Sequence, residues 1–531
     1  MEAKTITLFD CTLRDGGYYT DWDFGDALLE RYLDAMRTAV DIRSVEIGYR
    51  SPAKKTYFGR FFHLPRALAQ HCRDRLRPDQ RLAIMLNEKD VRPESVAGLI
   101  GDLAGVVNTI RFAVAPSKIG LAIELADACA ELGFSVGLNI MYLNTYVRKA
   151  AMLAPLARAK TEAVALVDSY GGCMPDEVRD TVAEARAVLP HPIGFHGHDN
   201  IGLAFANSLA AIEGGATTLD TTVAGMGRGA GNAKTELALS YLAARCGSEL
   251  DYSCLSSAVD LFVQMQKDYE WGANLAYMIS GFAGLPQADV MDWLGTRRYS
   301  LASIVAALRF QGGGEVDDKV YPDLSRSPLR AELGGRPALV IGGGESVIEH
   351  VDALKTLAVG SNMTLVHSTT RRAALFDDLR VPQIYCLAGQ ELGRLSTDAE
   401  RAILFRENRH VVTSEAPRLV GSAPQSANVY QAPHWVEEDA RERLGPVTDE
   451  PPLYLAFASA EAIDASDVYL AGFDGYRNAS ASQQANARDV QAALKLAETR
   501  WPHRSIVSVT PTSYNVACVS AYALSQTART A

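Results

Sequence analysis

The stretch PIGFHGH at residues 192–198 is a short apolar run that predicts a buried β-strand. It follows a helix-like segment at residues 177–189, which ends just before Pro190. Strands that alternate with helices of this kind are typical of βαβ units, which build parallel sheets.

The same alternation recurs through the first half of the chain. The other strand-like runs are Ile6–Leu13, Ser44–Gly48, Leu82–Leu86, Thr109–Val114, Ser135–Met141, Ala163–Asp168 and Thr217–Val223. Eight such units in roughly 240 residues match the size of a (β/α)8 TIM barrel. An open doubly wound sheet is the alternative, although it usually has fewer strands.

The pattern changes after about residue 245, where helices follow without strands and aromatic residues gather around Trp271. A broken polar stretch, Pro322–Gly335, then precedes a second series of strands. These runs are Arg336–Ile341, Thr364–His367, Gln383–Leu387, Arg409–Thr413, Leu453–Ala456, Val468–Ala471 and Ser505–Val509, and Pro417–Pro452 is expected to be an extended or mobile loop. We therefore predict a TIM barrel (residues 1–245), a helical extension (246–325) and a Rossmann-like α/β domain (326–531).

The bulk composition is that of a globular protein without a nucleic-acid partner. The 531 residues exceed one ordinary domain, and 52 basic against 63 acidic residues give a net charge of −11. Eight scattered cysteines without a C-x-x-C pair argue against a disulfide framework. Because we find neither a signal peptide nor an apolar run of about 18 residues, we expect a cytoplasmic protein without a membrane segment.

The strongest local signal is the H-x-H pair His196 and His198. Alternate residues of a strand face the same side, so the two imidazoles can share one divalent metal. They stand at the end of the seventh strand, and the strand ends form the catalytic face of a TIM barrel. Two surface histidines near a turn would be the alternative.

A second signal is the segment Asp10–Gly17, which we expect to end the first strand and open the first loop. Asp15 could complete a metal site with the two histidines, and Arg14 could stabilise a developing oxyanion. Gly16 and Gly17 would let the backbone turn sharply. The simpler alternative is a surface ion pair between Arg14 and Asp15.

A third signal is the glycine-rich run Gly225–Asn232, which follows the eighth strand. Loops after strands seven and eight often bind phosphate in TIM barrels, although such a run could equally be a flexible connector. Asn232 supplies an oxygen that could reach the metal or its ligands.

Together these three segments resemble the TIM-barrel metallolyase superfamily, which contains 4-hydroxy-2-oxovalerate aldolase, 3-hydroxy-3-methylglutaryl-CoA lyase and the 2-isopropylmalate and homocitrate synthases. The resemblance covers residues 4–245. The motifs that carry it are Asp-x-Thr-Leu-Arg-Asp-Gly at Asp10–Gly16, the H-x-H run at His196–Ala204, and the glycine-rich run at Gly225–Glu236.

The resemblance implies a divalent-metal aldolase or lyase that works through the enolate of a 2-oxo acid. It implies Asp15, His196 and His198 as ligands of Mn2+ or Mg2+, with Asn232 as a fourth or supporting partner. It implies Arg14 as a catalytic residue that stabilises the enolate oxygen. Glu46, Arg111, Asn139 and Ser169 lie at strand ends that face the same mouth, and we predict Glu46 as catalytic and the other three as substrate contacts. Tyr18 is a further catalytic candidate. Pyruvate is the expected 2-oxo acid, and an aldehyde or sugar-like compound is the expected acceptor.

One departure from the family pattern concerns the acid/base. The hydroxy-oxovalerate aldolases carry a histidine just after the Arg-Asp-Gly motif, whereas this chain continues Gly17-Tyr18-Tyr19-Thr20. Tyr18 could donate a proton but is a poor base at neutral pH. His63 or a metal-bound hydroxide could take the role of base, and the acceptor itself could differ.

The C-terminal region has a glycine-rich turn at Gly342–Ser346 between a predicted strand and a predicted helix. It resembles, loosely, the Rossmann-like domains of pterin-pyrophosphokinase-like proteins, and a docking or dimerisation domain is the alternative. The turn lacks a full G-x-G-x-x-G, so no dinucleotide is predicted. The aromatic segment around Trp271 predicts an exposed apolar patch and a homodimer.

Two further functions remain open from the sequence. A Claisen-type acyltransferase would use the same metal but activate acetyl-CoA against a 2-oxo acid. An inactive scaffold would keep the fold without the chemistry, and the joint presence of Arg14, Asp15, His196 and His198 argues against it.

Overall fold

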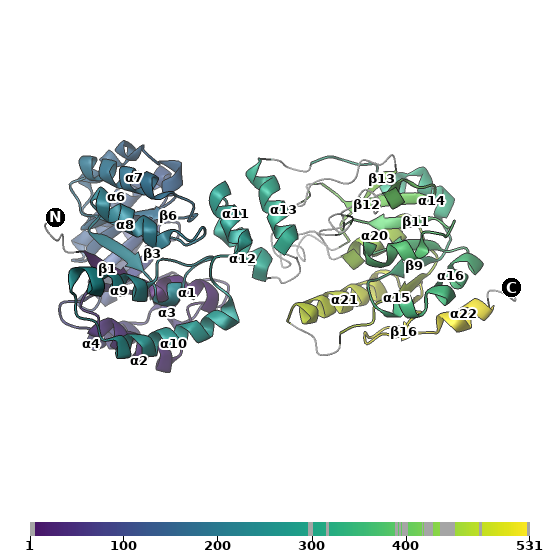
Figure 1. Cartoon of the computed structure of the whole chain (residues 1–531), viewed down its shortest axis with the longest axis horizontal. Helices are drawn as coiled ribbons and strands as arrows, with labels where there is room; N and C mark the ends of the chain where they lie inside the picture. Colours follow the sequence, from purple (N-terminus) through teal and green to yellow (C-terminus); the bar gives the residue numbers. More distant parts are fainter. Residues whose placement is uncertain are drawn as a thin grey trace. The chain divides into compact units, whose positions relative to one another are not determined.

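The computed structural model describes residues 6–295, 301–314, 318–387, 391, 395, 402–416, 418, 428–435, 452–476 and 481–527. The chain divides into two compact units, Met1–Ala288 and Asp289–Ala531, which Figure 1 shows in order of sequence. The three-part division at residues 245 and 325 stays a prediction. Among the described residues, no helix combines the length and apolar character that a membrane span requires.

The first unit is a closed barrel of eight parallel strands in sequential order, β1 to β8. The strands are β1 (Thr7–Asp10), β2 (Ile42–Tyr49), β3 (Arg81–Asn87), β4 (Thr109–Val114), β5 (Ser135–Ile140), β6 (Ala163–Asp168), β7 (Ile193–Gly197) and β8 (Thr218–Thr221). The barrel closes where β1 pairs with β8, with Phe9 opposite Asp220. The predicted TIM barrel is therefore confirmed.

Helices follow the strands around the outside of the barrel (Figure 1). They are α1 (Thr12–Thr20), α2 (Asp26–Thr38), α3 (Arg60–His63), α4 (Arg66–Arg75), α5 (Pro93–Ile100), α6 (Ile119–Glu131), α7 (Pro175–Val188), α8 (Ala204–Gly214) and α9 (Thr235–Cys246). Short 3-10 turns are η1 (Gly101–Leu103), η2 (Pro116–Lys118), η3 (Leu143–Thr145), η4 (Ala150–Arg158) and η5 (Val223–Gly225).

The segment Asp10–Gly17 differs from the expected loop, because helix α1 begins at Thr12. The carboxylate of Asp10 accepts hydrogen bonds from the backbone N–H (3.0 Å) and hydroxyl (2.7 Å) of Thr12, so it satisfies a donor of the first turn. Gly16 and Gly17 lie inside this helix rather than in a turn. Neither position has space for a side chain, because a Cβ at Gly16 would meet Met226 and one at Gly17 would meet Trp22.

The helical segment after residue 245 consists of α10 (Tyr252–Tyr269), α11 (Leu275–Ala283), α12 (Gln287–Gly295) and α13 (Leu301–Gly312). Helix α10 packs on α2. Trp271, which we expected in an exposed patch, is buried and donates its indole N–H to the carbonyl of Ala224 at 3.1 Å. Trp271 therefore packs within the barrel unit, and the homodimer stays a prediction.

The second unit holds one parallel sheet in the order β13-β12-β11-β10-β9-β14-β15-β16. Its strands are β9 (Ala338–Ile341), β10 (Thr364–His367), β11 (Gln383–Cys386), β12 (Arg409–Ser414), β13 (Val429–Ala432), β14 (Val468–Ala471), β15 (Ile506–Ser508) and β16 (Ala517–Cys518). The chain therefore enters the sheet at the central strand β9 and adds β10 to β13 on one side. It then adds β14 to β16 on the other side of β9, which is doubly wound topology. The predicted Rossmann-like class is confirmed.

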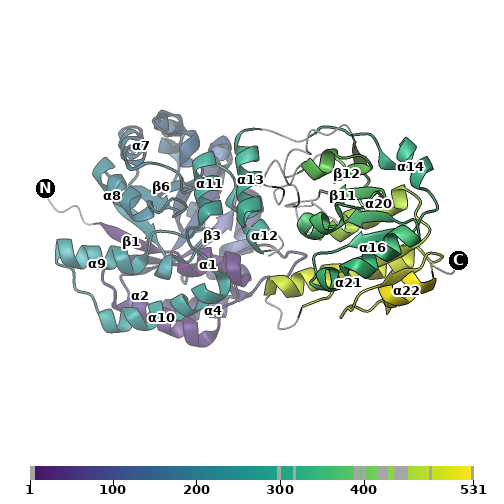
Figure 2. The ribbon, with the colours of Figure 1, turned by 45° about the vertical axis from the view of Figure 1, so that its right-hand side comes forward.

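Helices flank this sheet (Figure 2). They are α14 (Pro328–Leu333), α15 (Ser346–Glu349), α16 (Val351–Gly360), α20 (Pro452–Ala462), α21 (Ala481–Arg500) and α22 (Ala521–Thr527), with η6 (Leu324–Arg326), η7 (Thr370–Phe376) and η8 (Ala402–Phe405). Two predictions were wrong here. Leu453–Ala456 belongs to helix α20 rather than to a strand, and part of the expected loop Pro417–Pro452 forms β13. The rest of that loop lies outside the described residues, apart from Arg418, the residues that flank β13, and Pro452, which begins α20.

Candidate metal centre and active-site cavity

The histidines of the H-x-H pair lie together at the C-terminal end of β7. His196 is the fourth residue of the strand, His198 follows its last residue, and both are buried. Their ring centroids are 4.9 Å apart. The spacing of two residues therefore does what the sequence predicted and places both imidazoles on one side.

Each imidazole uses its Nδ1 atom in a hydrogen bond. His196 Nδ1 lies 3.0 Å from the Asp220 carboxylate, and His198 Nδ1 lies 2.9 Å from the Asp168 carbonyl oxygen. Both partners are acceptors, so each Nδ1 donates its proton, while His196 Nε2 lies 3.5 Å from the Asp15 carboxylate. A histidine that binds a metal is commonly held in this way by a carboxylate or a carbonyl.

Asp15 and Asn232 complete the cluster. One ligand atom each from Asp15, His196 and His198 can be chosen so that all lie within 4.8 Å of one another. The Asn232 amide donates to Asp15 Oδ2 at 2.5 Å, while its Oδ1 is buried without a hydrogen-bond partner in the part of the chain that the structure describes. Two imidazole nitrogens, a carboxylate and an unpartnered amide oxygen are donors that fit a divalent cation.

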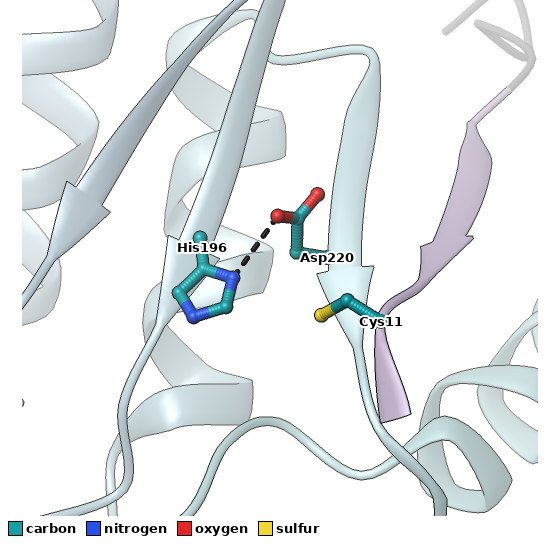
Figure 3. A group of neighbouring side chains, drawn as sticks. All are labelled: Cys11, His196 and Asp220. Atoms are coloured by element: carbon teal, nitrogen blue, oxygen red, sulfur yellow. Dashed lines mark hydrogen bonds and ion pairs between the residues drawn. The ribbon is translucent and has the colours of Figure 1, made fainter. Parts of the chain in front are cut away.

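A second cluster joins Cys11, His196 and Asp220, as Figure 3 shows. Here the His196 atom that faces Asp220 is Nδ1, which the hydrogen bond already occupies. Burial raises the pKa of the Cys11 thiol well above its ordinary value, so the sulfur stays protonated and donates to the Thr221 carbonyl. The cluster with Asp15 is therefore the better site for a metal.

A buried ion-pair network surrounds the cluster. Arg14 contacts Asp15 and donates from Nε to Glu46 at 2.8 Å. Arg111 bridges Glu46 (3.5 Å) and Asp220 (2.5 Å), and its Nε donates to Asn139 at 3.0 Å. With neutral histidines these side chains carry two positive and three negative charges. A divalent cation would leave the group with a net charge of +1, which suits an anionic substrate.

The pKa values follow from these surroundings. Burial lowers the pKa of His198 to about 3, which keeps the imidazole neutral and able to bind a cation. Burial also opposes the charge of Asp15, yet the Arg14 guanidinium and the histidines hold its pKa well below the ordinary range. Asp15 is therefore a carboxylate and His198 a neutral base at any ordinary pH.

The metal cluster opens into a cavity of about 220 Å³. Among the predicted site residues, Arg14, Asp15, Tyr18, Asn139, Ser169, His196 and His198 line this cavity. Glu46, Arg111 and Asn232 do not line it and contact its walls from behind. The Ser169 hydroxyl accepts a hydrogen bond from the Tyr142 backbone N–H at 2.8 Å.

Several cavity residues were missed from the sequence. They are Tyr49, Lys89, Tyr142, Tyr170, Arg228 and Gln287. The charge of Arg228 in the glycine-rich run was the available signal, and its guanidinium lies 5.0 Å from the centre of the Tyr18 ring. With Arg14 and Lys89 it makes the cavity basic, whereas Asp15 is its one acidic lining residue among those described.

The acid/base histidine of the family pattern, which this chain lacks, is not replaced by another histidine in the cavity lining that the structure describes. Among the described lining residues, the cavity contains no histidine besides His196 and His198. His63, which we considered as a substitute, lies at the end of α3 and does not line this cavity. The Tyr18 and Tyr49 hydroxyls, 3.3 Å apart, line this cavity together with Arg14 and Asp15 and can donate protons.

Fold and site together define the class: a parallel (β/α)8 barrel whose C-terminal mouth carries a buried cluster of two histidines and a carboxylate, as in barrel metalloenzymes. Comparison with known proteins narrows this class. Residues 123–262 match the HMGL-like family model. A 4-hydroxy-2-oxovalerate aldolase from Geobacillus genomosp. 3 is 28% identical over 54% of this chain and 85% of its own length.

Two further relatives agree. An oxaloacetate decarboxylase from Mycobacterium tuberculosis is 26% identical over 53% of this chain and 84% of its own length. A crystal structure of the N-terminal domain of a Bacteroides vulgatus protein assigned as an aldolase is 40% identical, with a TM-score of 0.53, over 57% of this chain and all of that domain. The chain belongs to the TIM-barrel metallolyase superfamily, and its relatives place it among the lyases.

Proposed function

We propose that the barrel makes or breaks a carbon–carbon bond through the enolate of a 2-oxo acid, with pyruvate as that acid and a divalent cation, Mn2+ or Mg2+, as cofactor. The observation that carries the proposal is the cluster of Asp15, His196 and His198, in which one ligand atom of each lies within 4.8 Å of the others and each histidine Nδ1 is held by an acceptor. The relatives named as an aldolase and a decarboxylase support the same chemistry.

The residues that would hold the cation are Asp15, His196 and His198, with the buried oxygen of Asn232 as a further ligand. When bound, the cation would act as a Lewis acid for the enolate oxygen and would orient the 2-oxo acid. The small cavity suits a short substrate, because pockets for drug-sized ligands span about 300–1,000 Å³.

Arg14 would stabilise the developing negative charge. Its Nε and Nη1 atoms bind Glu46 and Asp15, which fixes the guanidinium at the cavity wall. A donor held in place before the reaction costs little reorganisation when charge develops beside it. Arg228 and Lys89 would attract the substrate carboxylate, since both line the cavity.

In the direction of synthesis, a base takes one proton from C3 of pyruvate and the electron pair forms the enolate. C3 then bonds to the carbonyl carbon of an aldehyde, the carbonyl π pair moves to the oxygen, and that oxygen takes a proton. The product is a 4-hydroxy-2-oxo acid, and cleavage is the reverse sequence of steps.

The Tyr18–Tyr49 hydroxyl pair would give the proton to the new hydroxyl oxygen. Burial raises the pKa of Tyr49 well above its ordinary value, so Tyr49 stays protonated and can hold a hydrogen bond with Tyr18. Tyr18 lines the cavity beside Arg14 and Asp15. In this proposal Tyr18 would take the role that a histidine has in the hydroxy-oxovalerate aldolases.

Proton exchange at the pyruvate methyl group in heavy water, followed by NMR, tests the proposal. With Mg2+ the methyl signal should decay, and His196→Ala should abolish the decay. His71→Ala is the matched control, because His71 is exposed and pairs with Glu30. No exchange with either metal would contradict the proposal, and exchange of the acetyl-CoA methyl group instead would establish the Claisen-type alternative.

A further inference from the structure

A second cavity of about 320 Å³ adjoins the active-site cavity in the barrel unit. Tyr18 and Tyr49 line both cavities, and their hydroxyls lie 3.3 Å apart. The tyrosine pair therefore stands between the metal side and a larger space. None of the predicted site residues other than Tyr18 lines this second cavity.

Aromatic rings form most of its apolar wall. The Phe58 and Phe62 rings are stacked at 4.3 Å, and the Trp22 ring lies 4.9 Å from Phe62. Trp22 also contacts both tyrosines edge to face, at 4.9 Å from Tyr18 and 5.5 Å from Tyr49. A bound aromatic ring could make the same stacked and edge-to-face contacts with this wall.

The position of Trp22 is fixed to the helix that carries Arg14 and Asp15. Its indole N–H donates to the Arg14 carbonyl at 2.8 Å, and its ring packs on Gly17, where a Cβ would approach within 2.2 Å. Asp21 (φ 51°) and Trp22 (φ 57°) both have left-handed backbone conformations, which cost free energy in residues other than glycine. The chain keeps this strain and thereby directs the indole ring into the second cavity.

The polar groups of this cavity are mostly engaged elsewhere. Arg50 donates to the carbonyls of His63, Leu64 and Leu99 and to the Asp102 carboxylate, and Asp90 pairs with Lys54 at 2.6 Å. The Ser51 hydroxyl, in contrast, is buried and has no hydrogen-bond partner among the described residues. Asp21 and Asn87 also line the cavity, but most of its lining is aromatic or apolar, which suits an aromatic ring better than a sugar chain or a phosphate.

We propose that the second cavity binds the substituent of the acceptor aldehyde and that this substituent is a single aromatic ring. The proposal rests on the proposed function, because it places the aldehyde carbonyl at the Tyr18–Tyr49 pair and the ring among Trp22, Phe58 and Phe62. The size agrees, since an apolar cavity of about 150 Å³ already holds benzene in another protein. The substrate class is then an aryl aldehyde, and the product is a 4-aryl-4-hydroxy-2-oxo acid.

The test measures binding of benzyl alcohol, a probe that cannot react, to the full chain by saturation-transfer NMR. Ser51→Leu fills the cavity and Phe58→Ala removes part of its wall, so each should weaken binding by at least about tenfold, which corresponds to about 1.4 kcal/mol. Phe58 is only half-buried, so its variant tests the proposal even if Ser51→Leu does not fold. Tyr57→Ala is the matched control, because that ring is exposed and lies outside the cavity lining.

Turnover is measured in parallel with pyruvate and benzaldehyde, acetaldehyde or glyceraldehyde. Weaker benzyl alcohol binding in both cavity variants, with benzaldehyde preferred by at least about tenfold in kcat/KM, supports the proposal. Absent binding, binding that both cavity variants retain, or a preference for glyceraldehyde overturns it. If both cavity variants weaken benzyl alcohol binding but the protein does not exchange the pyruvate methyl protons, the proposed function is overturned and the aromatic-ring site is retained.

Discussion

At the residue scale, the histidine pair shows what a sequence can and cannot predict. The spacing of His196 and His198 was enough to predict that they share one side of a strand. It could not show which nitrogen of each ring is free, because that depends on Asp220 and on the Asp168 carbonyl. Asp220 lies 24 residues from His196 in the chain, and the pairing of β8 with β7 in the folded barrel brings the two side chains together.

The first prediction concerns Asp220. Asp220→Asn removes the negative charge that holds His196 Nδ1–H and pairs with Arg111. We expect the affinity for Mn2+ to fall by about 10–100-fold, as for other partners of metal-bound histidines, in a titration followed by electron paramagnetic resonance. Asp176→Asn is the control, since Asp176 is exposed and pairs with Arg148. Unchanged Mn2+ affinity in Asp220→Asn would show that Asp220 does not contribute to metal binding.

Arg14 is the subject of the second prediction. Arg14→Lys replaces the planar guanidinium, which contacts both Asp15 and Glu46, by a single ammonium group. Pyruvate methyl exchange at saturating Mg2+ should slow by about 10²–10³-fold, as for the loss of one oxyanion donor. The exposed Arg43, which pairs with Asp79, gives the control Arg43→Lys. Exchange at the wild-type rate would show that Arg14 does not stabilise the enolate.

At the scale of elements, the prediction failed where side-chain packing decides the local structure. The pair Gly16-Gly17 suggested a turn, but the glycines lie within α1 because Met226 and Trp22 occupy the space of their side chains. The apolar run Leu453–Ala456 suggested a strand, but α20 is buried around most of its circumference and so shows no helical periodicity. A short apolar run does not distinguish these cases.

The third prediction tests the packing of α1. Gly17→Ala places a Cβ 2.2 Å from the Trp22 ring, so the ring must move. Overpacking of this kind costs about 1–3 kcal/mol, and we expect a lower Tm together with weaker benzyl alcohol binding. At Gly25 an added Cβ meets nothing within 4 Å, so Gly25→Ala should change stability by no more than about 0.5 kcal/mol. Equal Tm values for the two variants would contradict the close packing of Trp22 on α1.

At the scale of the whole molecule, both sheets were predictable and the order of the second sheet was not. Eight strand–helix units suffice to predict a closed barrel, because few other folds use that count. The edge strands of the second sheet are β13 and β16, and the sequence of neither strand predicts a strand clearly. Val429–Ala432 lies within a stretch rich in proline, glutamine and serine, and β16 has two residues. The Rossmann-like class was predicted, whereas the strand order itself follows from the pairing of β9 with both β10 and β14.

The last prediction concerns the second unit and its buried histidine. His367 lies in β10, stacks on Tyr385 at 4.7 Å, and forms a hydrogen bond with Gln383 at 2.8 Å. Burial lowers its pKa to about 4, whereas an unfolded histidine has a pKa of about 6.5. Between these two values the unfolded chain binds the extra proton, so the stability of the folded unit must fall as the pH drops from about 6.5 to 4.

The expected loss is about 1.4 kcal/mol for each pH unit in that window, or about 3 kcal/mol in all. Urea unfolding followed by tryptophan fluorescence can measure it, because Trp435 and Trp501 lie in the core of this unit. His367→Gln removes the titrating group and should flatten the dependence between pH 6.5 and 4.5, whereas His503→Gln, at an exposed position, should leave it unchanged. If His367→Gln keeps the wild-type slope, the loss of stability in acid comes from other groups, and the buried imidazole of β10 does not control it.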